Sequence, residues 1–190
     1  GGMRKRAGLA RALALDPENL LILNSYSSFL SRQGRHEEAI ERLNVVIQTA
    51  PDHYGALVNM GAALSELNRN AEAIVMYENA LEIKPTYMGY SNLGTALARE
   101  KRYPEAVVAI NKALELDDSG SLAWGNLAFV YSWMDGMEKQ ASDTFEHAIE
   151  RHHQQDSEAL ILEVPLLLEA NMHHLVDKVI EQAEHRELID

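Results

Sequence analysis

Cysteine does not occur in the sequence, and its absence excludes a disulfide framework and thiolate chemistry. Proline and glycine are scarce, with 5 and 11 residues, and no low-complexity tract is present, so we expect an ordered chain. No apolar run approaches the roughly 20 residues of a membrane-spanning helix, and the longest candidate is interrupted by Glu163 and Pro165. No secretory signal is recognisable. The missing signal and the missing apolar run favour a cytoplasmic protein that does not enter a membrane.

Basic residues are also few. The chain has 17 Lys and Arg and 29 Asp and Glu, which gives a net charge of -12. Such a chain repels phosphate backbones, which argues against nucleic acid as a partner, whereas it favours basic protein partners. Neither a glycine-rich phosphate loop nor a G-x-S-x-G or H-E-x-x-H motif is present. The neighbouring histidines 152–153 and 173–174 point about 100° apart on a helix, unlike an i, i+4 metal pair. We therefore expect no enzymatic activity, no metal and no cofactor.

What the sequence does contain is a repeat with a period of 33 to 36 residues. Small residues recur at its anchor position, as in Gly61, Gly94 and Ala128. Further small residues follow each anchor, and a bulky residue stands between them. The first small residue of each period is Ala39, Ala73, Ala106 or Ala141, and the second is Val46, Ala80, Ala113 or Ala148. The bulky residue between the two is Leu43, Tyr77, Ile110 or Phe145. Each period holds two runs of helical periodicity joined by a short polar turn, in which Gly34 and asparagines can adopt positive φ.

This pattern resembles the tetratricopeptide repeat, W-x2-L-G-x2-Y followed by A-x3-F and P. The stretch from residue 124 fits it closely, with Trp124, Leu127, Tyr131, Ala141 and Phe145 at the expected spacings. The resemblance implies an all-α fold, a right-handed α-solenoid of stacked antiparallel helix hairpins. It also implies a protein or peptide partner. The small residues are expected to let helices touch, for example Gly61 against Ala73.

The period predicts one array of repeats along the chain. The expected segments are 3–19 as the second helix of a truncated repeat, repeats at 20–53, 54–86, 87–120 and 121–156, and a divergent capping repeat at 157–190. Because the first helix of the truncated repeat is missing, we expect the parent protein to extend beyond the N-terminus.

Asparagine recurs two residues before the small anchor, at Asn59, Asn92 and Asn126, while Ser25 holds that position in the first repeat with Asn24 beside it. First helices line the concave face of such arrays, and a carboxamide can pair with both the C=O and the N–H of a peptide unit. The arrangement is similar to the asparagine ladder in the repeats of O-linked N-acetylglucosamine transferases, which holds the backbone of an extended peptide. The alternative is a structural role, in which each amide bonds to a neighbouring helix.

Five further positions are predicted to line the same groove: Arg32, Thr95, Arg99, Phe129 and Trp133. The two aromatic residues are four apart and share one helix face, where they either anchor a partner's apolar side chain or pack on the last repeat. Chaperone-binding members of the family hold a terminal carboxylate with several cations. The two arginines are the only cations at the groove positions, so that role is disfavoured.

These observations favour a scaffold that binds an extended peptide segment through its asparagines. The alternative is a structural or dimerisation arm, or a regulatory C-terminal region, of a larger multidomain protein such as a bacterial signalling protein. In that case a second copy of the chain is the partner.

Overall fold

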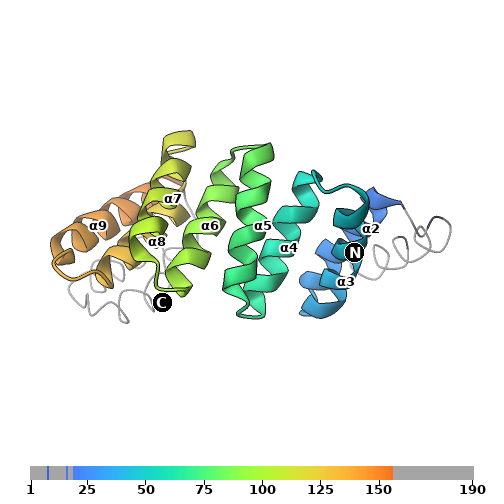
Figure 1. Cartoon of the computed structure of the whole chain (residues 1–190). Helices are drawn as coiled ribbons and strands as arrows, with labels where there is room; N and C mark the ends of the chain where they lie inside the picture. The colour runs from blue at the N-terminus through green and yellow to red at the C-terminus, as the bar shows by residue number, and fades with distance from the viewer. Residues whose placement is uncertain (1–7, 9–15, 17–18, 156–190) are drawn as a thin grey trace. The chain divides into compact units, whose positions relative to one another are not determined.

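A computed structural model describes residues 8, 16 and 19–155 of the chain, and within these residues the structure is helical with no strand (Figure 1). The helices are α2 (Leu20–Ser31), α3 (His36–Thr49), α4 (Tyr54–Glu66), α5 (Asn70–Ile83), α6 (Tyr87–Arg99), α7 (Tyr103–Leu116), α8 (Ser121–Ser132) and α9 (Glu138–Gln155). The predicted capping repeat 157–190 lies outside the described residues. So does the predicted helix 3–19, apart from Gly8, Asp16 and Asn19.

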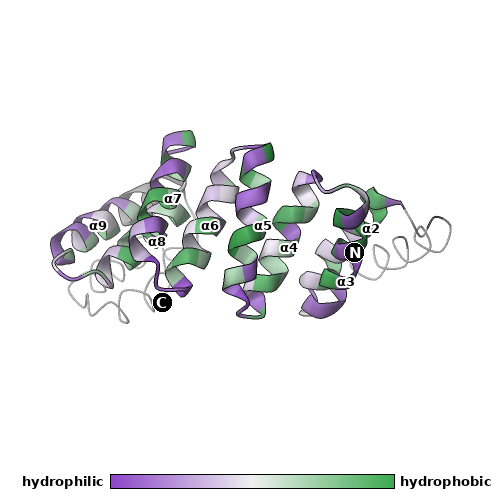
Figure 2. Ribbon diagram, viewed as in Figure 1, coloured by the Kyte–Doolittle hydropathy of each residue, from purple (hydrophilic) through white to green (hydrophobic). Residues whose placement is uncertain are grey.

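The chain divides into two compact units, Gly1–Ala96 and Leu97–Asp190, which we call the N-terminal and C-terminal units. In the N-terminal unit α2 packs on α3 and α4 on α5, and α4 also packs on α2 and α3. In the C-terminal unit α8 packs on both α7 and α9. Polar and apolar residues alternate along the helices, as expected where one face is buried (Figure 2). The predicted repeat boundaries remain a prediction.

A residue with left-handed backbone precedes the second helix of each hairpin. The residues and their φ angles are Gly34 (74°), Asn68 (58°), Lys101 (60°) and Gly136 (78°). The glycine and the asparagine are recognisable from sequence because both types adopt this conformation readily. Lys101 is not recognisable by type. Its place 33 residues after Asn68 is the only sequence signal for it.

Replacing Gly34 isolates the energetic contribution of this backbone conformation. Gly34→Ala is expected to lower the free energy of unfolding by about 1 kcal/mol, because a side chain at positive φ is strained. A Cβ at Gly34 would meet no atom within 4 Å, so no packing change contributes. Urea denaturation measures the effect, and Lys101→Gly serves as the reciprocal variant that should not lose stability. An unchanged unfolding midpoint for Gly34→Ala would contradict the prediction.

The small residues of the repeat are buried where helices meet, and Ala39, Ala73, Ala80, Ala106 and Ala113 are all 0% exposed.

The side chain nearest to Gly61 is the ring of Tyr77 on α5. A Cβ there would lie 2.6 Å from Cε1 of Tyr77, whose side chain is 3% exposed. Tyr77 follows the expected neighbour Ala73 by one helical turn, so the glycine accommodates a bulky ring.

Candidate functional site

Two predicted asparagines are hydrogen-bonded to each other in the N-terminal unit. Nδ2 of Asn59, on α4, donates to Oδ1 of Asn24, on α2, at 2.8 Å. Both residues are half-buried and stand beside buried positions of their helices, Leu23 on α2 and Met60 on α4. The helix packing thus brings the two amides together.

Gly55, one turn before Asn59 on α4, borders the same pair. A Cβ at Gly55 would lie 3.4 Å from Nδ2 of Asn24, which is close to van der Waals contact. The glycine therefore keeps space open beside the amide nitrogen.

The remaining polar atoms of this pair are Nδ2 of Asn24 and Oδ1 of Asn59. Neither has a hydrogen-bond partner within the described part of the chain, and neither is buried from solvent. An amide nitrogen is a donor and an amide oxygen is an acceptor, so the pair offers one of each to a ligand. A peptide unit, with one C=O and one N–H, carries the complementary groups.

Ser25, which the repeat alignment places at the asparagine position of the first repeat, is exposed, and the neighbouring Asn24 makes the contact. An alignment identifies equivalent positions in successive repeats. Contact between two helices depends on how their axes cross, and here it joins residues 35 apart in sequence.

Asn92 lies half-buried on α6 in the register of Asn59, and among the described residues its carboxamide has no hydrogen-bond partner. We call the side of the N-terminal unit that carries the Asn24–Asn59 pair the amide face. Thr95, also on α6, donates its hydroxyl to the carbonyl of Ser91 at 3.0 Å. The hydrogen-bonded part of the predicted ladder in this unit is therefore the Asn24–Asn59 pair.

The predicted arginines are both exposed. Arg32 follows α2 and donates through Nε to the carbonyl of Ser28 at 3.3 Å, whereas Arg99 stands in the last turn of α6.

In the C-terminal unit, Asn126 and Phe129 lie half-buried on α8, and Trp133 directly follows this helix. The two aromatic rings meet edge to face, with centroids 6.1 Å apart, and Trp133 is 52% exposed. The alternative that they pack on residues 157–190 lies outside the described residues.

A feature that sequence reasoning missed is an ion pair at the start of three second helices. The pairs are Arg35–Glu38, Arg69–Glu72 and Arg102–Glu105, each with two hydrogen bonds of 2.6 to 2.7 Å. The recurrence of R-x-x-E after 34 and then 33 residues is the signal that could have found them. In each pair the hydrogen bonds from arginine lower the pKa of the glutamate.

These lowered pKa values predict a loss of stability in acid. A glutamate with a folded-state pKa below its unfolded value contributes stability above the unfolded value, and the contribution disappears as pH falls through the folded value. The free energy of unfolding is therefore expected to decrease from about pH 4.3 downward. The triple variant Glu38→Gln, Glu72→Gln and Glu105→Gln should show a shallower decrease in acid denaturation. Added salt should reduce the difference, because the pairs are exposed; identical slopes would contradict the prediction.

No helix in residues 19–155 has both the length and the apolar character of a membrane span. Within the same residues, no group of three or more His, Asp or Glu side chains is arranged to hold a metal ion.

Comparisons with known proteins agree with the repeat pattern. Two family models described as "Tetratricopeptide repeat" match residues 30–93 and 89–119. A curated relative, the "Type IV pilus assembly protein PilF" of Pseudomonas aeruginosa, is 33% identical over 75 residues, 38% of this chain. The chain matches 30% of the length of that relative.

Solved structures show a similar fold. The crystal structure of MamA gives a TM-score of 0.73 at 19% identity, covering 82% of this chain and 96% of that one. MamA from Desulfovibrio magneticus RS-1 gives 0.72 at 23% identity, covering 78% and 84%. The structure titled "YrrB: a TPR protein with an unusual peptide-binding site" gives 0.65 at 17% identity, covering 94% and 91%. The predicted all-α solenoid class is therefore confirmed.

Proposed function

We propose that this chain, whose residues 30–119 belong to the tetratricopeptide-repeat family, is an interaction scaffold that binds an extended segment of a partner protein. The single observation that carries the proposal is the Asn24–Asn59 hydrogen bond, which orients both amides and leaves one donor and one acceptor without a partner in the described residues and not fully buried. The partner's backbone supplies the matching acceptor and donor. Because the contact is to the backbone, the pair tolerates many partner side chains. The net charge of -12 favours a basic segment.

The remaining predicted residues extend the same proposal. Asn92 holds the same register in its repeat as Asn59, and we propose that its half-buried carboxamide binds a further peptide unit. Asn126, Arg32, Thr95, Arg99, Phe129 and Trp133 are proposed as further contacts of the partner. We propose no catalytic role for the chain and a cytoplasmic location.

Replacing Asn24 by aspartate separates peptide binding from helix packing. Asn24→Asp keeps the oxygen that accepts from Nδ2 of Asn59, so the bond between the helices is retained. It removes the amide donor that has no partner in the described residues, and the new carboxylate repels a peptide carbonyl. A peptide that depends on this donor should bind about tenfold more weakly, equivalent to about 1.4 kcal/mol.

The experiment selects linear peptides from a random phage-displayed library on the full chain and measures their affinity by calorimetry. Asn79→Asp is the matched control, because Asn79 is an exposed residue of α5 and the charge change is the same. Asn59→Ala removes both the interhelix bond and the open acceptor, so it should weaken binding and stability together. Equal affinities for the unmodified chain and Asn24→Asp would show that the pair serves packing alone.

A structural role in a larger assembly is the second candidate. Similarity to a pilus assembly protein over 75 residues favours it. Under this reading the chain forms dimers whose mass depends on concentration and whose amide face is covered by the second copy. Light scattering combined with the Asn24→Asp variant tests this, since a dimer joined at that face should dissociate more readily.

A further inference from the structure

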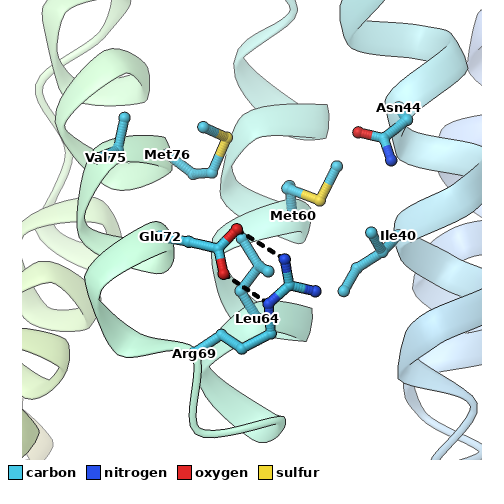
Figure 3. Close-up of a pocket in the computed structure, with 8 residues that line it drawn as sticks. All are labelled: Ile40, Asn44, Met60, Leu64, Arg69, Glu72, Val75 and Met76. Atoms are coloured by element: carbon cyan, nitrogen blue, oxygen red, sulfur yellow. Dashed lines mark hydrogen bonds and ion pairs between the residues drawn. The ribbon is translucent and has the colours of Figure 1, made fainter.

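A cleft of about 270 Å³ lies in the N-terminal unit between α3, α4 and α5, and no predicted site residue borders it (Figure 3). From α4 it is lined by Met60 and Leu64, which are roughly 100° and 140° around the helix from Asn59. The cleft and the amide pair therefore occupy different sides of α4, and one ligand residue cannot fill both.

Five of the eight residues that line the cleft are apolar, and the other three are Asn44, Arg69 and Glu72. Met60 and Leu64 are each 4% exposed, while Ile40 on α3 and Met76 on α5 are half-buried, and Val75 is 47% exposed at the edge. Sites for drug-sized molecules measure roughly 300–1,000 Å³, so this smaller cleft suits a single large side chain.

Two features favour an aromatic side chain in particular. The thioethers of Met60 and Met76 border the same space, and methionine sulfur makes favourable contacts with the edges of aromatic rings (Figure 3). The guanidinium of Arg69 lies at the same cleft, held by Glu72, and a guanidinium stacks favourably on a ring face. An aliphatic side chain would be stabilised only by burial of its apolar surface, without the contacts of sulfur and guanidinium with a ring.

The charges at the mouth favour a cation beside that ring. Arg69 is paired with Glu72 at the cleft and also interacts electrostatically with Glu37 of α3, so two carboxylates act on one guanidinium. The chain as a whole carries -12. A Lys or Arg next to the ring would meet an excess of carboxylate, whereas an Asp or Glu would be repelled.

We propose that this cleft is a second docking site, which takes one aromatic side chain from a partner protein segment whose adjacent residues are Lys or Arg. The site is independent of peptide binding at the amide face. Partners that carry both an extended basic segment and such an aromatic residue would contact two sides of the same unit.

Methionine methyl NMR on the full chain tests the proposal directly, because the seven methionines serve as local probes. The titrants are the blocked peptides Ac-Lys-Trp-Lys-NH2, Ac-Lys-Ala-Lys-NH2 and Ac-Glu-Trp-Glu-NH2. Saturable ring-current shifts are expected at Met60 and Met76, assigned with their leucine variants, for the Lys-Trp-Lys peptide. The alanine peptide should give no saturable shift, and the glutamate peptide should bind at least fivefold more weakly.

Val75→Lys is the blocking variant, since it places a cation at the exposed edge and should weaken Lys-Trp-Lys binding at least tenfold. Val108→Lys on α7 is the matched control, because Val108 is also exposed and follows Val75 by one period of 33 residues. Asn24→Asp should leave this titration unchanged, so failure here is distinguishable from failure of the amide-face proposal. Unshifted Met60 and Met76 methyls, or equal binding of the three peptides, would overturn the proposal. Shifts that grow with protein concentration alone would assign the cleft to a second copy and overturn it as well.

Discussion

Gly61→Ala is expected to lower the free energy of unfolding by about 2–3 kcal/mol, the upper part of the range for overpacking a core. The added Cβ would lie 2.6 Å, 2.8 Å and 2.9 Å from three ring carbons of Tyr77. Carbon atoms at van der Waals contact are about 3.5–4.0 Å apart, so α4 or the ring must shift. The ring is 3% exposed and has little space into which to move.

Urea denaturation measures this effect, and Gly55→Ala on the same helix is the control. Its Cβ would come no closer than 3.4 Å to any atom, so Gly55→Ala should be neutral or slightly stabilising through helix propensity. Combining Gly61→Ala with Tyr77→Leu removes the ring that causes the clash. The double variant should be more stable than the sum of the single effects predicts, by at least about 1 kcal/mol. Additive effects would show that Tyr77 does not explain the requirement for glycine.

Helix content and the class of fold could be predicted from sequence because small residues recur at a fixed period. Gly61, Ala73 and Ala80 recur at equivalent places in later periods, and such recurrence survives changes in surface residues. The contact of Gly61 with Tyr77 could not be read in the same way. Two residues one turn apart on the facing helix satisfy the same pattern, and the choice between them depends on the rotation of that helix about its axis.

The sequence predicted that asparagines form the candidate site, but it did not predict which of them contact each other. The recurrence of asparagine marked Asn59 and Asn92, but the alignment gave the matching position in the first repeat to Ser25. The bond to Asn24 depends on the crossing of α2 over α4, which sequence spacing does not contain. The cleft could not be predicted, since its lining combines residues of three helices that each follow the ordinary apolar pattern of a repeat.

The two proposed sites of the N-terminal unit recognise different parts of a partner, one its backbone and the other a side chain. In the proposed function, Asn24 and Asn59 offer groups that every peptide backbone matches, so they would contribute affinity without selecting a side chain. The cleft around Met60 and Met76, as proposed, would select a ring with an adjacent cation and so contribute specificity. A partner that engages both sites through one flexible chain would gain from the high effective concentration of its second segment.

Phe145→Ala is expected to cost about 3–5 kcal/mol, because Phe145 is 1% exposed and deleting a buried ring removes its contacts and leaves a cavity. The ring stands on α9, which packs on α8 within the C-terminal unit. In repeat proteins each repeat contacts only the repeats next to it, so stability is distributed along the chain. The loss should therefore be concentrated in the C-terminal unit.

Hydrogen exchange followed by mass spectrometry shows which helices lose stability. In Phe145→Ala the amides of α8 and α9 should lose protection, while those around the buried Leu43 and Tyr77 of the N-terminal unit should keep it. Trp133→Ala is the comparison, because a residue that is 52% exposed and packs edge to face on Phe129 should lose less, about 1 kcal/mol. Equal loss of protection in α2 to α5 would mean that the two units unfold as one cooperative body. The peptide-binding variants of the N-terminal unit would then have to be corrected for global stability before their affinities are compared.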